Sequence, residues 1–238
     1  MTSISSFDVR VDRRWLEAEG IIGVDLAPVG AVELPQFSAG ASIDLILPIG
    51  VARSYSIASA SNRRDRYTLA VYREPQSLGG SAWIYQKMHE GQVLRAEGPW
   101  NDFPLAGGSV HSVLFAGGIG IAPLMSMALQ LDRQGSSFEL HYAARSAKCA
   151  AFLEALKQVG RAHKVECYFG HGGSGIRLDF EKALRRVPRL SHLYFCGPDR
   201  FILQGIEQAR AAGWEEGRLH SESFSAAMKE LEHGAPRS

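Results

Sequence analysis

The spacing of hydrophobic and polar residues along the chain changes character near residue 107. Before that point, short stretches alternate apolar and polar residues, and Gly, Pro, Asn and Asp fall between several of them, as is typical of antiparallel strands. We expect strands at 7–11, 21–26, 42–47, 55–58, 67–72 and 92–96. One short helix is expected at 81–89, between Gly79-Gly80 and Gly91. This half of the chain predicts a small antiparallel barrel or sandwich.

After residue 107, predicted strands and helices alternate. The strands are expected at 109–115, 138–143, 164–169 and 192–195, and the helices at 122–134, 147–158, 179–186 and 199–212. This order predicts a parallel sheet covered on both faces, with ligands bound at the carboxyl ends of its strands. The predicted architecture is a β-barrel domain at 1–106, an α/β nucleotide-binding domain at 107–226, and a tail or truncated linker at 227–238.

The composition narrows the class of protein. The chain is 45% hydrophobic and 21% charged with a net charge of +1, so no electrostatic argument favours a nucleic acid or anionic membrane as partner. No apolar run approaches the roughly 20 residues that span a bilayer, and the N-terminus has no signal-peptide core. These features predict a cytoplasmic protein.

Cysteines and histidines do not group into a metal site. The three cysteines, Cys149, Cys167 and Cys196, are scattered and form no CxxC motif. We therefore expect no metal and no iron–sulfur cluster in this chain, and no disulfide framework. The eight histidines show no metal-ligand spacing, and the absence of a GxSxG motif argues against a hydrolase.

The segment Arg53-Ser54-Tyr55-Ser56 offers the groups that a flavin mononucleotide needs. On a strand, Arg53 and Tyr55 point to one side while Ser54 and Ser56 point to the other. The arginine would meet the phosphate, the tyrosine would form a wall for the ring, and a serine would contact the reactive ring nitrogen. The alternative is a surface strand with one arginine and one half-buried tyrosine, and for the tetrapeptide alone this alternative is preferred.

Two glycine-containing turns precede predicted helices. In Gly79-Gly80-Ser81, the serine is expected to cap the helix, and free backbone N–H groups can bind a phosphate. The stretch 116–123 follows an apolar strand, and its glycines Gly117, Gly118 and Gly120 allow a pyrophosphate to approach the backbone. It matches neither the GxGxxG fingerprint nor the P-loop. The alternative in both places is an ordinary turn before a helix.

Two further motifs stand near the C-terminal end. Cys196-Gly197-Pro198 follows a strand where its thiol would lie beside a nicotinamide, although a buried structural cysteine is the commoner explanation. In Glu222-Ser223-Phe224 the aromatic ring is either a displaceable cover over a flavin or a hydrophobic plug.

Together, these motifs occur in an order that resembles the ferredoxin–NADP reductase superfamily, most closely reductases of the phthalate dioxygenase and vanillate demethylase type. The flavin-binding strand, the phosphate loop with Arg73-Glu74, the nucleotide loop and the last two motifs each look like a counterpart in that family. The stretch 98–105 is similar to its GPxNxFxL inter-domain motif. The resemblance extends over about residues 7 to 226.

The resemblance implies FMN rather than FAD, a nicotinamide donor, and hydride transfer between the two. It implies catalytic roles for Ser56, Cys196 and Phe224. The expected cofactor-binding residues are Arg53, Ser54, Tyr55, Ser56, Val71, Arg73, Gly79, Gly80, Ser81, Gly117, Gly118, Ile119, Gly120, Arg145, Cys196, Gly197, Pro198 and Phe224.

The family also implies a plant-type ferredoxin domain, which needs roughly four cysteines. Only 14 residues (225–238) follow Phe224 and none is cysteine, so we expect either a natural two-domain version or a chain cut at the linker.

The implied function is that of a reductase passing electrons from NAD(P)H through FMN to a ferredoxin or Rieske-type oxygenase component. The alternatives are a stand-alone flavin or ferric reductase and a non-catalytic flavin- or nucleotide-binding regulatory subunit. Arg145 with nearby Lys148 would favour NADPH, whereas the resemblance favours NADH, and the sequence leaves that choice open.

Overall fold

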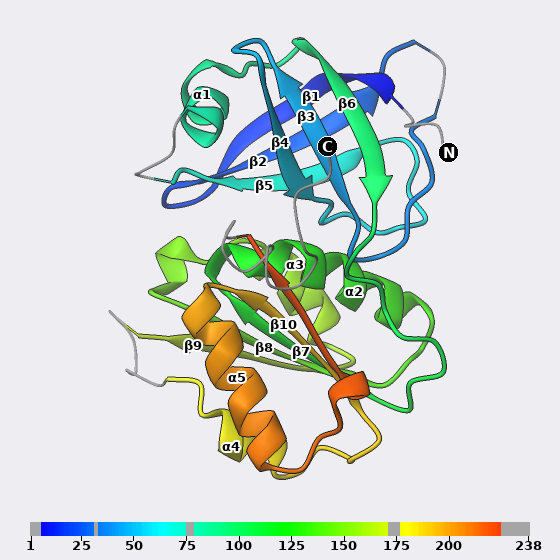
Figure 1. The fold of residues 1–238 in the computed structure, drawn as a ribbon. Helices are drawn as coiled ribbons and strands as arrows, with labels where there is room; N and C mark the ends of the chain where they lie inside the picture. The colour runs from blue at the N-terminus through cyan, green and yellow to red at the C-terminus, as the bar shows by residue number, and fades with distance from the viewer. Residues whose placement is uncertain (1–5, 31–32, 75–78, 171–176, 225–238) are drawn as a thin grey trace.

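The computed structural model describes residues 6–30, 33–74, 79–170 and 177–224. The first half forms a six-stranded antiparallel sheet in the order β4-β3-β6-β1-β2-β5 (Figure 1). Its strands are β1 (Ser6–Ala18), β2 (Ile21–Pro28), β3 (Ser42–Leu47), β4 (Val51–Ser56), β5 (Tyr67–Tyr72) and β6 (Val93–Trp100). The sheet closes into a barrel just after β4, where Ile57 bridges Leu69 and the Ala58 N–H donates to the Thr68 carbonyl.

Alternation of apolar residues builds the barrel core. In β3, every second residue is buried, and Ile43, Leu45 and Leu47 point inward. The helix α1 (Gly80–Lys87) adds Ile84 to this core. Strand β4 begins at Val51, four residues earlier than expected, because Val51 and its neighbours pair along β3 down to Leu47.

The second half is a five-stranded parallel sheet in the order β11-β10-β7-β8-β9. Its strands are β7 (Ser112–Gly117), β8 (Phe138–Ala144), β9 (Lys164–Phe169), β10 (His192–Gly197) and β11 (Leu219–Ser223). Helices α2 (Ile121–Arg133) and α3 (Leu153–Val159) cover one face, and α4 (Phe180–Leu184) and α5 (Asp199–Ala211) cover the other. Short 3-10 turns are η1 (Gly118–Gly120), η2 (Ala147–Cys149) and η3 (Glu216–Arg218). The predicted fold class is confirmed.

The expected helix at 147–158 is interrupted. The chain leaves η2 after Cys149, and Phe152 adopts a left-handed conformation with φ 62° before α3 begins at Leu153. The Ala151 N–H donates instead to the hydroxyl of buried Tyr142, at 3.0 Å. Strand β11 was also missed, because its residues are only half-buried and alternate weakly.

One of the apolar clusters contains residues from both halves of the chain. Alanines of the barrel side pack in the same cluster as α2, and the shared residues include Ala18, Ala39, Ala58, Ala70, Leu124, Met125 and Met127. Phe103, from the connection between the sheets, is buried there and lies edge-on to Tyr194 at 5.9 Å. The Asn101 amide donates to the Ser38 and Ala39 carbonyls, which fastens this connection to the barrel.

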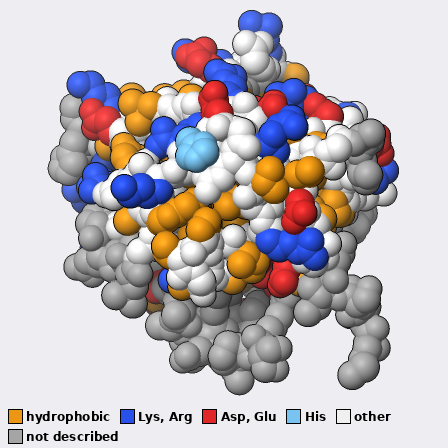
Figure 2. Space-filling model, turned by 90° about the horizontal axis from the view of Figure 1, so that it is seen from above, with side chains coloured by type: hydrophobic (Ala, Val, Ile, Leu, Met, Phe, Trp, Pro, Cys, Tyr) orange, Lys and Arg blue, Asp and Glu red, His pale blue; other side chains and the backbone are white. Residues whose placement is uncertain are grey.

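The outer face of the barrel carries charged side chains of both signs among hydrophobic ones (Figure 2), consistent with the net charge of +1. Within the described ranges, none of the helices has the length and apolar character needed to cross a bilayer.

Candidate functional site

The residues directly after β7, β8, β10 and β11 lie at one edge of the parallel sheet, because parallel strands end on the same side. The turn η1 follows β7 at this edge and lies against β5 of the barrel. Ile119 of η1 and Tyr72 of β5 both pack on the shared core. The barrel and the carboxyl edge of the sheet therefore meet at the glycine loop.

The glycines of this loop serve two different purposes. A Cβ at Gly120 would lie 2.2 Å from the Cys196 carbonyl oxygen, so the backbones of η1 and β10 touch and leave no room for a side chain. Gly118 has φ +55°, and a Cβ there would meet nothing within 4 Å. The backbone at Gly118 is thus open to a ligand, as a pyrophosphate-binding loop requires.

Strands β10 and β11 end beside this loop. The Cys196 side chain is fully buried in the shared core, and Pro198 precedes the first turn of α5. The Ser223 hydroxyl donates to the Asp199 carboxylate at 2.6 Å, which ties the end of β11 to α5. Phe224 follows with 44% of its surface exposed. Phe224 therefore stands at the carboxyl edge of the sheet, partly open to solvent.

On the barrel side, Arg53 of β4 lies against the start of α1. A Cβ at Gly80 would be 2.7 Å from the Arg53 side chain, so only glycine permits this contact. The helix begins after Gly79 with no side-chain cap and no acidic residue in its first turn. Its first N–H groups lack helical acceptors, and the helix dipole favours an anion there. An uncapped helix start beside a guanidinium group fits a phosphate.

Three aromatic side chains lie on the same two elements, β4 and α1. Tyr55, Trp83 and Tyr85 are partly buried against the barrel core, and the Arg73 guanidinium lies 5.4 Å from the centre of the Tyr85 ring. Burial raises the pKa of the Tyr55 phenol from 10.0 to about 12, although the positive charge of Arg53 lowers it. The Tyr55 phenol is therefore uncharged at physiological pH.

The remaining predicted residues are dispersed around this region. Ser54 is exposed, Ser56 is buried, and the Val71 side chain lies in the barrel core, so that a ligand would reach only its backbone. Arg145 is exposed directly after β8. Ser81 does not cap α1, because the helix already begins at Gly80 and the Ser81 hydroxyl accepts from the Glu74 N–H at 3.3 Å.

Sequence reasoning missed Glu17. Its carboxylate accepts hydrogen bonds from the Phe152 N–H at 2.6 Å and from the Trp15 indole at 2.5 Å. Glu17 and Phe152 are 135 residues apart, and no local pattern signals the contact. Within the described ranges, no group of three or more His, Cys, Asp or Glu side chains is arranged to hold a metal ion.

The raised pKa of Tyr55 predicts a loss of stability in alkali. The folded chain keeps the phenolic proton up to about pH 12, whereas the unfolded chain releases it near pH 10, so stability falls as pH rises through this window. Between pH 8 and 11 we expect wild type to lose about 1 kcal/mol more unfolding free energy than Tyr55→Phe, measured by denaturant titration. An equal loss in both proteins would contradict burial of the phenol.

Comparisons with known proteins identify the family. No family model matches the chain. Vanillate O-demethylase oxidoreductase of Pseudomonas putida is 43% identical over 220 residues, which are 92% of this chain and 69% of that protein. The crystal structure of phthalate dioxygenase reductase is 31% identical with a TM-score of 0.85, covering 96% of this chain and 71% of its own.

A type IV self-sufficient cytochrome P450 monooxygenase is 33% identical with a TM-score of 0.85, and the match covers 92% of this chain but 28% of that protein. The same two-sheet unit therefore also occurs as part of a larger enzyme. The chain belongs to the family of oxygenase reductases that includes vanillate O-demethylase oxidoreductase and phthalate dioxygenase reductase.

Proposed function

We propose that this chain is the reductase component of an oxygenase system, which takes hydride from NAD(P)H onto FMN and passes electrons to a ferredoxin or Rieske-type oxygenase. The observation that carries the proposal is the contact of η1 with β5, which places an open glycine loop against the barrel that carries Arg53. The similarity to vanillate O-demethylase oxidoreductase and phthalate dioxygenase reductase supports it. The protein would work in the cytoplasm.

In this proposal the barrel, residues 1–106, is the flavin-binding domain. The flavin phosphate is bound by Arg53, Arg73 and the uncapped start of α1, and the flavin ring packs against Tyr55. In this proposal these groups would meet one phosphate at one helix start, and for this reason we favour FMN over FAD. A flavin held by these residues would supply a hydride acceptor that can release electrons one at a time.

The second domain, residues 107–226, binds the nicotinamide nucleotide. The backbone of Gly117, Gly118, Ile119 and Gly120 holds the pyrophosphate, and Arg145 stands where the adenosine ribose is expected. Phe224 is displaced when the nicotinamide enters, while the backbone around Cys196 and Gly197 lines its site. Because hydride transfer requires reacting atoms about 3–3.5 Å apart, the work of these residues is positioning.

Replacing Arg53 tests the flavin phosphate site. Arg53→Gln removes the cation beside α1, and we expect the Kd for FMN to rise about 10–100-fold because a charge-assisted hydrogen bond is lost. The Kd for riboflavin, which has no phosphate, should change less than about twofold. Both constants follow from quenching of flavin fluorescence, and titration with FAD in parallel compares the two nucleotide forms.

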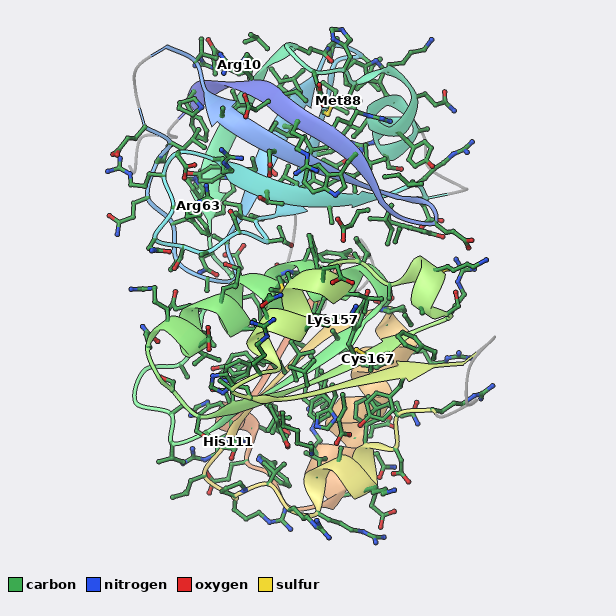
Figure 3. All side chains as sticks on the ribbon, turned by 180° about the vertical axis from the view of Figure 1, so that it is seen from behind. Arg10, Arg63, Met88, His111, Lys157 and Cys167 are labelled. Atoms are coloured by element: carbon green, nitrogen blue, oxygen red, sulfur yellow. The ribbon has the colours of Figure 1, made fainter. Side chains whose placement is uncertain are left out.

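Arg63→Gln is the matched control. Arg63 pairs with Asp65 on an exposed barrel loop, on the other side of the barrel from Met88, which follows α1 (Figure 3). FMN affinity should match wild type in this variant. Equal weakening of riboflavin and FMN in Arg53→Gln would overturn the assignment of Arg53 to the phosphate.

Replacing Gly118 tests the pyrophosphate loop. Gly118→Ala places a methyl group in open space on the loop, where we expect it to obstruct the nucleotide and raise the KM for NAD(P)H at least about tenfold. Gly135→Ala is its control, because Gly135 also has positive φ (+64°) and open space but lies beyond the far end of α2. Both variants carry similar backbone strain, so an equal KM in the two would refute the role of the loop.

A further inference from the structure

The segment between β8 and α3, Ala147–Phe152, is held by the barrel as well as by its own sheet. The Glu19 N–H of the barrel donates to the Lys148 carbonyl at 2.8 Å, and the Tyr142 hydroxyl of β8 accepts from the Ala151 N–H at 3.0 Å. The Phe152 N–H donates to the Glu17 carboxylate at 2.6 Å. Seen from behind, α3, which carries Lys157, lies directly below the barrel (Figure 3).

Glu17 is itself fixed in place by Trp15. The indole N–H donates to the second carboxylate oxygen at 2.5 Å, so each oxygen accepts one hydrogen bond. The Trp15 ring lies flat on the barrel, since a Cβ at Gly23 would be 2.1 Å from it, and the Arg13 guanidinium is 4.7 Å from its centre. We call Trp15, Glu17 and Phe152 the Glu17 clasp.

Glu17 binds the backbone at a residue with an unusual conformation. Phe152 is the one non-glycine residue of the described ranges with positive φ, and it stands directly before α3, where helix N–H groups lack backbone acceptors. A charged acceptor on such an N–H is stronger than a neutral one. The carboxylate therefore stabilises both the left-handed residue and the start of α3.

The held segment follows Arg145 and Ser146, at the carboxyl end of β8, where the adenosine half of a dinucleotide binds in this class of fold. Resting on the proposed function, we infer that Glu17 is a positioning residue for that half of the nucleotide. It sets the adenosine-binding segment at a fixed place relative to the flavin-binding barrel. It touches no reacting atom and acts through the backbone of Phe152.

Glu17→Gln tests this inference with the FMN-loaded protein. Phe152 and Trp15 donate to different oxygens of the carboxylate, and an amide of the same shape replaces one of these oxygens with an NH2 group, which then faces a donor. We expect the KM for NADH or NADPH to rise about tenfold, which corresponds to the loss of one charge-assisted hydrogen bond. With reduced nicotinamide mononucleotide, which lacks the adenosine half, KM should stay within about twofold of wild type.

Glu154→Gln is the matched control, since Glu154 lies on α3 with 84% of its side chain exposed, and both KM values should be unchanged. Trp15→Phe keeps the hydrogen bond from Phe152 to Glu17 but removes the one from the indole. We expect it to raise the KM for the dinucleotide by about threefold, less than Glu17→Gln does. FMN affinity and melting temperature, measured for every variant, report on folding.

Equal rises in KM for the dinucleotide and the mononucleotide would overturn the inference, as would a Glu17→Gln protein with wild-type KM for both. Weakened FMN binding in that variant would also overturn it, because the clasp would then support the barrel. If wild type is reduced by no nicotinamide at all, the proposed function fails instead, so the two failures are distinguishable.

Discussion

Close packing of the barrel against α2 and α3 is the contact on which the rest of the site depends. The barrel contributes small side chains, Ala18, Ala39, Ala58 and Ala70, to a core shared with Met125 and Met127. Small residues let the backbones approach, and each buried apolar Å² contributes about 25 cal/mol. Because of this approach, β5 reaches η1, and the proposed flavin and nucleotide elements meet at one place.

Apolar burial is non-directional, so it cannot by itself fix how the two sheets are oriented. Polar contacts at the rim supply that direction. Glu17 accepts from Phe152, and Gln130 of α2 accepts from the Ser61 hydroxyl at 2.8 Å. A reaction that depends on the placing of two bound groups requires this kind of fixed orientation.

Local patterns predicted most of the fold. Strands β3, β5 and β9 begin and end where alternation and turn residues place them. The local pattern does not predict the break at Phe152. The Ala151 and Phe152 N–H groups there donate to Tyr142 and Glu17, which come from other strands. Likewise, Ser81 looked like a cap, but Gly79 and Gly80 already open the helix beside Arg53. Each candidate motif is a run of neighbouring residues, so the sequence alone reveals it. The contact of Glu17 with Phe152 joins residues that are far apart in the sequence, so no local pattern reveals it.

The central claim is that an FMN held by the barrel is reduced by a nucleotide held by the parallel sheet. Its most direct measurement is anaerobic stopped-flow mixing of the FMN-loaded protein with NADH and, separately, with NADPH, following the visible flavin absorbance. The account predicts rapid bleaching with at least one nucleotide, saturating with its concentration and far faster than free FMN reacts in solution. Bleaching no faster than that of free FMN with either nucleotide would contradict it.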